Sequence, residues 1–185
     1  MNPQPSSQTT LLDGGELGAL TFRWLGDRYA HRWVFPTSDG VVELASIDRF
    51  DEQRNTCASP PLQQIHLQDF GDGRRVAFGV GMAGRGHWSA SFTLVPDLDC
   101  WVVELACRCP IKPMWLGSSY ALTCPWEIDE RVAAASWQLE DCRILLEPIA
   151  PRSQLAAEEN MLTICPAEIS DSATTQWAFR LRRQN

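Results

Sequence analysis

The stretch that decides the fold is residues 173–183, ATTQWAFRLRR, near the end of the chain. Every second side chain there is suited to burial, and the side chains between them are mostly polar: Thr175, Trp177, Phe179 and Leu181 against Thr174, Gln176, Arg180 and Arg182. Side chains of an extended strand point alternately to its two faces. The period of two therefore predicts a strand with one buried face and one solvated face.

The same alternation occurs in residues 86–95, GHWSASFTLV, and in residues 100–109, CWVVELACRC. Between these two segments lies the sequence Pro96-Asp97-Leu98-Asp99, in which proline pre-sets the geometry of a turn. Two strands joined by so short a connection pair antiparallel. We therefore expect residues 86–109 to form neighbouring antiparallel strands that share one buried face.

Similar short segments, separated by Gly, Asp and Pro, run through most of the chain. The predicted strands are residues 19–25, 28–36, 40–48, 61–69, 74–82, 86–95, 100–109, 116–123, 137–147, 161–165 and 173–183. They predict a mostly β fold, an antiparallel meander of about ten strands that forms a β-sandwich or an up-and-down β-barrel. One or two short helices are expected, at 125–135 behind Pro125 and at 153–160 with Ser153 as N-cap.

The chain has the length of one domain, since 185 residues can bury a core without disulfides or metals. Residues 1–16 are expected to form a flexible tail, because MNPQPSSQTT offers nothing to bury, and residues 17–185 a single antiparallel β domain. Residues 49–60 are polar, end in prolines, and predict a surface loop.

Composition excludes several classes of function. A net charge of −7 opposes binding to nucleic acid, where Lys and Arg must replace phosphate counterions. No apolar run is long enough to span a membrane or to act as a signal peptide. Seven cysteines, an odd number in a chain of this size, are more typical of reduced thiols in the cytoplasm than of a disulfide scaffold.

Residues 79–84, GVGMAG, match the G-x-G-x-x-G pattern of dinucleotide-binding proteins, and Glu104 follows at a suitable distance. That chemistry needs a helix to begin at the glycines, so that its amide groups meet the pyrophosphate. The residues that follow alternate as a strand instead. We therefore interpret the glycines as a tight turn between strands, with Gly79 and Gly81 leaving room on a crowded sheet face.

The predicted ligand-binding residues lie in and beside this segment. Arg85, His87, Ser89 and Ser91 would share one strand face, where Arg85 could hold a carboxylate or phosphate and His87 could exchange a proton. The alternative is an ordinary solvated face of an antiparallel sheet. Trp115 and Trp126 flank a Pro-rich, irregular region and could expose an indole to a sugar.

A metal site is the weaker interpretation of Cys107 and Cys109, which share a strand face with Trp101, Val103 and Leu105. Zinc ribbons usually pair cysteines with two residues between them on a knuckle turn, and the chain has no second close pair. We expect these thiols to be core residues, and we expect neither a metal nor a cofactor.

Three functions remain open. The first is a non-enzymatic module that binds a small-molecule or carbohydrate ligand, or a protein, through a concave face or irregular loops. The second is an acid–base enzyme acting on a sugar or similar polar molecule, with His87 and Glu104 as catalytic residues and Arg85 beside them. The third is an assembly subunit that engages a partner through residues 1–10 and 49–60, in an oligomer of unknown size.

Overall fold

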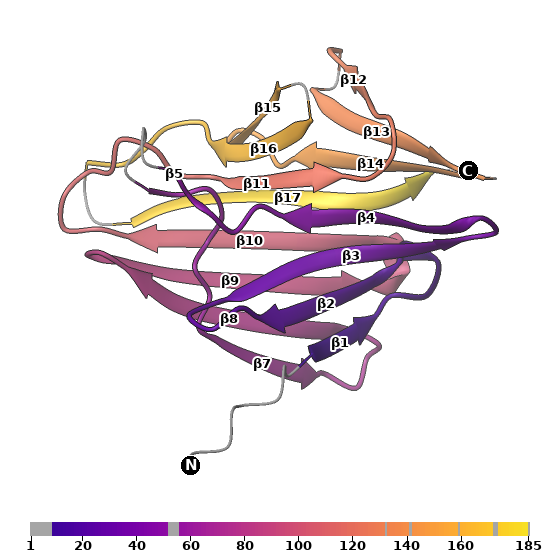
Figure 1. Cartoon of the computed structure of the whole chain (residues 1–185), viewed down its shortest axis with the longest axis horizontal. Coiled ribbons are helices and arrows are strands. Elements are labelled where there is room, and N and C mark those ends of the chain that lie inside the picture. The colour runs from indigo at the N-terminus through magenta and orange to yellow at the C-terminus, as the bar shows by residue number, and fades with distance from the viewer. Residues whose placement is uncertain are drawn as a thin grey trace.

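A computed structural model describes residues 9–51, 56–131, 133–140, 142–158, 160–171 and 174–184. Two antiparallel sheets face each other as a sandwich, with no closure into a barrel (Figure 1). The seven-stranded sheet has the order β1 (Thr9–Asp13), β2 (Ala19–Trp24), β3 (Tyr29–Thr37), β4 (Gly40–Ser46), β11 (Ser118–Leu122), β16 (Met161–Pro166) and β15 (Ser153–Glu158). The eight-stranded sheet has the order β12 (Glu127–Asp129), β13 (Ala134–Leu139), β14 (Cys142–Pro148), β17 (Thr174–Gln184), β10 (Cys100–Arg108), β9 (Gly86–Val95), β8 (Arg75–Ala83) and β7 (Gln64–Asp69). A small pair, β5 (Phe50–Asp51) and β6 (Thr56–Cys57), lies outside both.

The chain is a meander only in part. Runs of hairpins build β1 to β4, β7 to β10 and β12 to β14, but the chain changes sheet between these runs. The last strand, β17, inserts between β14 and β10, and β11 inserts between β4 and β16. The mostly β prediction is confirmed, and of its two closures the sandwich is the one formed. In the described part of the chain, no helix is long and apolar enough to cross a membrane.

Both predicted helices are wrong. Residues 153–158 form β15, which pairs with β16, and the Ser153 Oγ accepts a hydrogen bond from the Ala178 N–H at 2.7 Å instead of capping a helix. In 125–135, three residues form β12 against β13. Short segments follow the partner strand that tertiary structure offers, even where local propensity favours a helix. The described residues hold only two short 3₁₀ turns, Gly15–Leu17 and Pro96–Leu98.

Two predicted boundaries are also wrong. The segment 137–147 is not one strand, because a turn with Glu140 at a positive φ of 34° separates β13 from β14. The expected tail of residues 1–16 already contains a strand, β1, which pairs with β2 along its whole length. Its Leu12 is buried in the core, so this strand belongs to the sandwich. Residues 1–8 lie outside the described residues.

The core lies between the sheets and is rich in aromatic rings. Phe22 on β2 meets Phe92 on β9 edge to face, with ring centroids 5.2 Å apart. Tyr120 on β11 meets Phe179 on β17 at 5.7 Å, and Trp33 on β3 meets the same phenylalanine at 6.2 Å. The faces predicted for β9, β10 and β17 are confirmed, since Trp88, Ala90, Phe92, Leu94, Trp101, Val103, Leu105, Cys107, Thr175, Trp177, Phe179 and Leu181 are all buried.

His31 is part of this core. Its Nε2 shares a hydrogen bond with the Tyr120 hydroxyl at 3.0 Å, and burial lowers the pKa of the imidazole to about 3. Burial also raises the pKa of Tyr120. Both side chains are therefore neutral over the physiological range, and they tie β3 to β11 inside the seven-stranded sheet.

The glycines of residues 79–84 lie in β8 and its turn into β9, not at the start of a helix. A Cβ on Gly79 would lie 2.8 Å from a methyl group of Leu62, and a Cβ on Gly81 would collide with the carbonyl of Pro61. The glycines thus let residues 61–62 pass close over β8. The interpretation as a hairpin with crowded glycines is confirmed.

Replacing Phe92 by Ala should lower the free energy of unfolding by about 3 to 5 kcal/mol, because it removes a ring that contacts both sheets and leaves a cavity. Urea denaturation followed by tryptophan fluorescence measures the change. The matched control is Phe70→Ala at an exposed ring, for which we expect about 1 kcal/mol or less. Equal losses in the two variants would contradict the assignment of Phe92 to the core.

Candidate ligand-binding site

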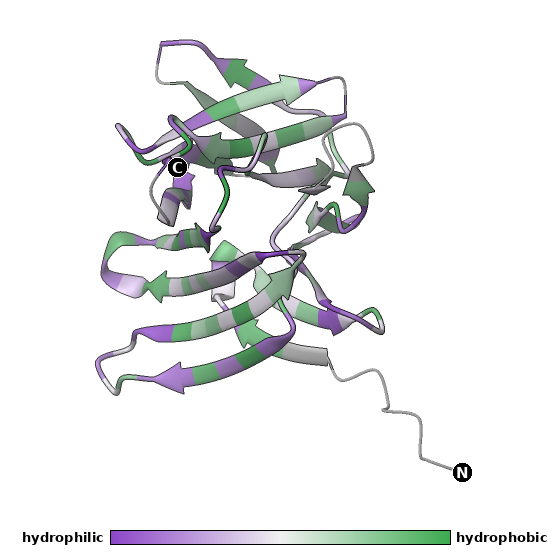
Figure 2. Cartoon of the chain, turned by 90° about the vertical axis from the view of Figure 1, so that its left-hand side faces the viewer, coloured by the Kyte–Doolittle hydropathy of each residue, from purple (hydrophilic) through white to green (hydrophobic). Residues whose placement is uncertain are grey.

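A pocket of about 410 Å³ opens at one end of the sandwich. It lies between the turn that joins β8 to β9, the segment 109–116 that follows β10, and the small pair β5–β6. Figure 2 views the molecule from this end and shows the alternation of hydrophobic and hydrophilic residues along the strands. The volume falls in the range typical of small-molecule sites.

The inner wall of the pocket belongs to the protein core. Trp88 on β9, Leu116 and Cys57 are buried and line it. Its mouth is apolar as well, although it faces water: Ile111 is 65% exposed and Met114 is 86% exposed. Isolated exposed apolar side chains are common, but a group of them around a pocket makes it a candidate binding surface.

All charged side chains in the described lining of this pocket are cationic. They are Arg85 in the β8–β9 turn and Lys112 in the segment after β10. A neighbouring shallow depression is lined by Arg85, His87 and Arg108, again with no carboxylate among its described residues. The charged side chains that line both depressions are therefore cationic, although the chain carries a net charge of −7.

The two cations of the pocket differ in their partners. Lys112 forms an ion pair with Asp171 at 2.9 Å, but both side chains are well exposed, so the pair is weak and readily exchanged. No carboxylate of the described residues pairs with Arg85. A guanidinium in this position can form paired hydrogen bonds to a carboxylate or phosphate.

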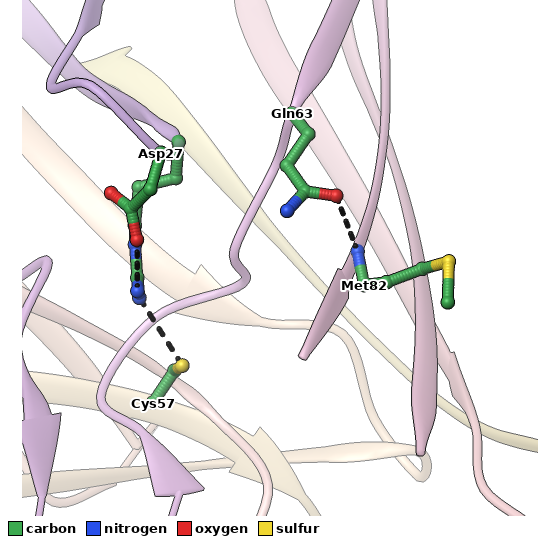
Figure 3. A network of polar contacts seen from close by, with 5 residues as sticks. Asp27, Cys57, Gln63 and Met82 are labelled. Atoms are coloured by element: carbon green, nitrogen blue, oxygen red, sulfur yellow. Dashed lines mark hydrogen bonds and ion pairs between the residues drawn. The ribbon is translucent and has the colours of Figure 1, made fainter. Parts of the chain in front are cut away.

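Polar contacts hold the pocket wall in place (Figure 3). The Arg28 guanidinium donates to Cys57 Sγ at 3.2 Å and to Asp27 Oδ2 at 2.6 Å. The hydrogen bond between Arg28 and Asp27 raises the pKa of Arg28 and lowers the pKa of Asp27, so both side chains stay charged. On the other side of the segment, Gln63 Oε1 accepts a hydrogen bond from the Met82 N–H at 3.1 Å. These contacts attach residues 57–63 to the β2–β3 turn and to β8.

Asp48 lies near this network and is partly buried. Burial raises the pKa of its carboxyl from 3.8 to about 6, against the opposing effects of a hydrogen bond from Ser46 Oγ at 2.5 Å and the charge of Arg28. The Oδ1 atom of Asp48 is buried without a hydrogen-bond partner among the described residues. Burial therefore destabilises the ionised carboxylate of Asp48 in the folded protein.

Because the folded pKa of Asp48 lies above the unfolded value, the native state binds the extra proton between about pH 4 and pH 6. Stability from this group is therefore present at low pH and is lost as the pH rises through about 6. Asp48→Asn should remove this loss and raise the free energy of unfolding at neutral pH by about 1 to 3 kcal/mol.

Urea denaturation at several pH values between about 4 and 7 tests this expectation. Asp72→Asn is the contrasting variant, because hydrogen bonds from the backbone and side chain of Arg74 lower the pKa of Asp72. Its replacement should change the slope of stability against pH in the opposite sense. A slope that Asp48→Asn leaves unchanged would contradict the assignment.

The predicted strand face is the outer face of the eight-stranded sheet, and the structure divides its residues between two places. Arg85 lines the end pocket and the adjacent depression, and His87 lines the depression only. Ser89 and Ser91 instead line a separate shallow groove of about 250 Å³ near the middle of the sheet. The four residues therefore do not converge on one ligand.

The middle groove contains Glu104, whose register partner on β9 is Ser91. Arg152 lies 3.8 Å from the Glu104 carboxylate, and the half-exposed ring of Phe78 lies in the same lining. Gln176 completes its polar side chains. The groove thus combines an aromatic ring with several hydrogen-bonding groups.

His87 and Glu104 lie on neighbouring strands, but the register keeps them apart. His87 is opposite Arg108, four residues along β10 from Glu104. At the rise of a β-strand this offset is about 13 Å. The idea that strand pairing brings this acid near this histidine is therefore wrong, and the two cannot share one proton transfer in this geometry.

The two tryptophans predicted as ligand-binding residues are only partly exposed. The Trp115 ring lies against Gly117, where a Cβ would approach the ring to 2.6 Å. Trp126 packs against the hydrophobic core. Neither ring is among the residues that line the end pocket or the middle groove, so their role in binding stays a prediction.

The seven cysteines are free thiols. Cys107 Sγ and Cys109 Sγ lie 3.4 Å apart, with Cys107 buried and Cys109 partly exposed in the end pocket. Among the described residues, no group of three or more His, Cys, Asp or Glu side chains is arranged to hold a metal ion.

Arg85, which the sequence pattern singled out, lines the pocket, but the pattern did not predict the apolar mouth. Phe50, Ile111 and Met114 come from different loops, and only the fold brings them together. The sequence did contain one indication of this mouth. Ile111 and Met114 are large apolar residues in the Pro-rich segment 110–114, which is not expected to form a strand that could bury them. No protein-family model matches this chain, and no curated protein matches it either.

Proposed function

We propose that this chain is a binding module whose end pocket takes a small amphipathic anion, a molecule with a hydrocarbon or aromatic body and a carboxylate. The observation that carries the proposal is the combination of an apolar pocket with cationic side chains as its charged lining, in an acidic protein. The apolar body would lie against Trp88 and Leu116, and the carboxylate would face Arg85 and Lys112.

The free energy of binding expected for such a complex can be estimated from its contributions. Burying about 150 Å² of hydrocarbon contributes ~4 kcal/mol, and a charge-assisted hydrogen bond to a guanidinium contributes about 1.5 to 3 kcal/mol more. Losses of translational and side-chain freedom offset part of this gain. Dissociation constants from about 100 micromolar to millimolar are the expected range.

The acid–base enzyme is the weaker alternative. Its proposed catalytic residues, His87 and Glu104, lie about 13 Å apart along the sheet. The buried His31 is neutral and hydrogen-bonded in the core, away from solvent. An assembly role and a cytoplasmic location stay proposals, and most of the segments named for assembly, residues 1–8 and 52–55, lie outside the described residues.

Calorimetric titration with octanoate and with 1-octanol, which share one hydrocarbon chain, tests the proposal. We expect octanoate to bind at least about tenfold more tightly, because only the carboxylate meets the cations. Arg85→Gln should weaken octanoate by about 5- to 30-fold and leave 1-octanol nearly unchanged.

The matched control is Arg143→Gln, which removes an exposed guanidinium from β14, where it pairs with Glu127. This variant should bind octanoate as the parent protein does. Equal affinity for the acid and the alcohol, or the same loss in both arginine variants, would contradict a specific anion site at the pocket.

The middle groove supports a second candidate function, the binding of a saccharide. A sugar presents an apolar ring face and a rim of hydroxyls, which the Phe78 ring and the polar side chains of Ser89, Ser91 and Gln176 could match. Phe78→Ala should abolish any saccharide binding detected on an oligosaccharide array and leave octanoate binding unchanged. Saccharide binding that survives this substitution would place the sugar elsewhere.

A further inference from the structure

The end pocket contains a pair of thiols that the ligand proposal does not use. Cys107 is the last core residue of β10, and Cys109 is the first residue beyond that strand. Their sulfur atoms lie 3.4 Å apart. The opposite strand offers no side chain at this point, since a Cβ on Gly86 would lie 3.2 Å from Cys109 Sγ and 3.3 Å from Cys107 Sγ.

We propose that Cys107 and Cys109 form a reactive dithiol that reduces small disulfides and is itself converted into an intrachain disulfide. The pair has the arrangement that this exchange needs, with one thiol open to solvent and a second thiol held next to it. It requires no ligand in the pocket, so it stands independently of the anion-binding proposal.

The two thiols have different accessibility. Cys109 is partly exposed and lines both the end pocket and the neighbouring depression. Cys107 is buried beneath it, and burial together with the adjacent thiol raises its pKa. Cys109 is therefore the thiol that attacks the small disulfide first.

The surroundings of Cys109 favour an anionic substrate. The charged residues in the described linings of the two depressions are Arg85, Arg108 and Lys112, all cationic, with His87 beside them. Reactive cysteines occur in partly exposed, electropositive sites of this kind. A disulfide that carries carboxylates, such as oxidised glutathione, would be attracted to this end of the protein.

The exchange takes place in two steps. The Cys109 thiolate attacks one sulfur of the small disulfide, breaking its S–S bond and releasing one small thiolate, which takes up a proton. Cys107 then loses its proton and attacks Cys109 Sγ, forming the intrachain disulfide and releasing the second small thiol. Two protein thiols are oxidised, and one small disulfide is reduced to two thiols.

The backbone can accommodate this bond. Two residues of extended chain place the Cα atoms about 6.6 Å apart, within the upper part of the range for disulfides. The paired part of β10 ends at Arg108, and Cys109 is followed by Pro110, which has no N–H to continue the sheet. The sulfur atoms must move closer by little more than one ångström, from 3.4 Å to about 2.05 Å.

The test treats the fully reduced, folded protein with oxidised glutathione, blocks the remaining thiols with N-ethylmaleimide, and digests it with trypsin. Trypsin cleaves after Arg108, between the two cysteines, so only a disulfide keeps the two peptides joined. Mass spectrometry with fragmentation should show the Cys107–Cys109 link forming at least about tenfold faster than any adduct at Cys165, a partly exposed thiol in the other sheet.

Three variants separate the steps. Cys107→Ser should trap one glutathione on Cys109, because the second thiol is missing. Cys109→Ser should leave Cys107 unmodified, and Cys165→Ser should react as the parent protein does. Modification of Cys109 no faster than Cys165, or a lasting glutathione adduct on Cys109 in the parent protein without joined peptides, would overturn the proposal.

Discussion

The structure depends on the interlocking of aromatic side chains between its two sheets. Phe22, Trp33 and Tyr120 extend from the seven-stranded sheet and meet Phe92 and Phe179 of the eight-stranded sheet. Rings of this size bury large apolar areas and prefer edge-to-face contacts, which fix the sheets at one separation and one offset. The period of two in the strands supplies these rings, so the register of each strand follows from the core.

The end pocket is a consequence of this packing. Trp88 belongs to the same buried face as Phe92, but it lies at the start of β9, where the sheets end. There the core is covered by loops instead of strands, and the loop residues Ile111 and Met114 remain exposed. The Arg28–Cys57 contact and the Gln63–Met82 contact attach residues 57–63 to the β2–β3 turn and to β8, and Cys57 at the start of this segment lines the pocket.

The sequence predicted the strands and their buried faces wherever alternation was long, as in β9, β10 and β17. It failed at β15 and β12, which are short and whose state depends on a partner strand far along the chain. The candidate site was predictable in part. Arg85 follows from local pattern, whereas the 13 Å between His87 and Glu104 depends on strand register, and the apolar mouth depends on loops that meet only in space.

The proposed amphipathic anion would bind against the Trp88 end of the core. The most direct measurement is the titration of nitrogen-15-labelled protein with octanoate, followed through the indole N–H signals of its tryptophans. We predict a saturable shift of the Trp88 signal, while the signal of Trp137, which packs against Phe35 away from the pocket, stays in place. Shifts of equal size at both indoles, or no shift of Trp88 at saturating octanoate, would contradict this proposal.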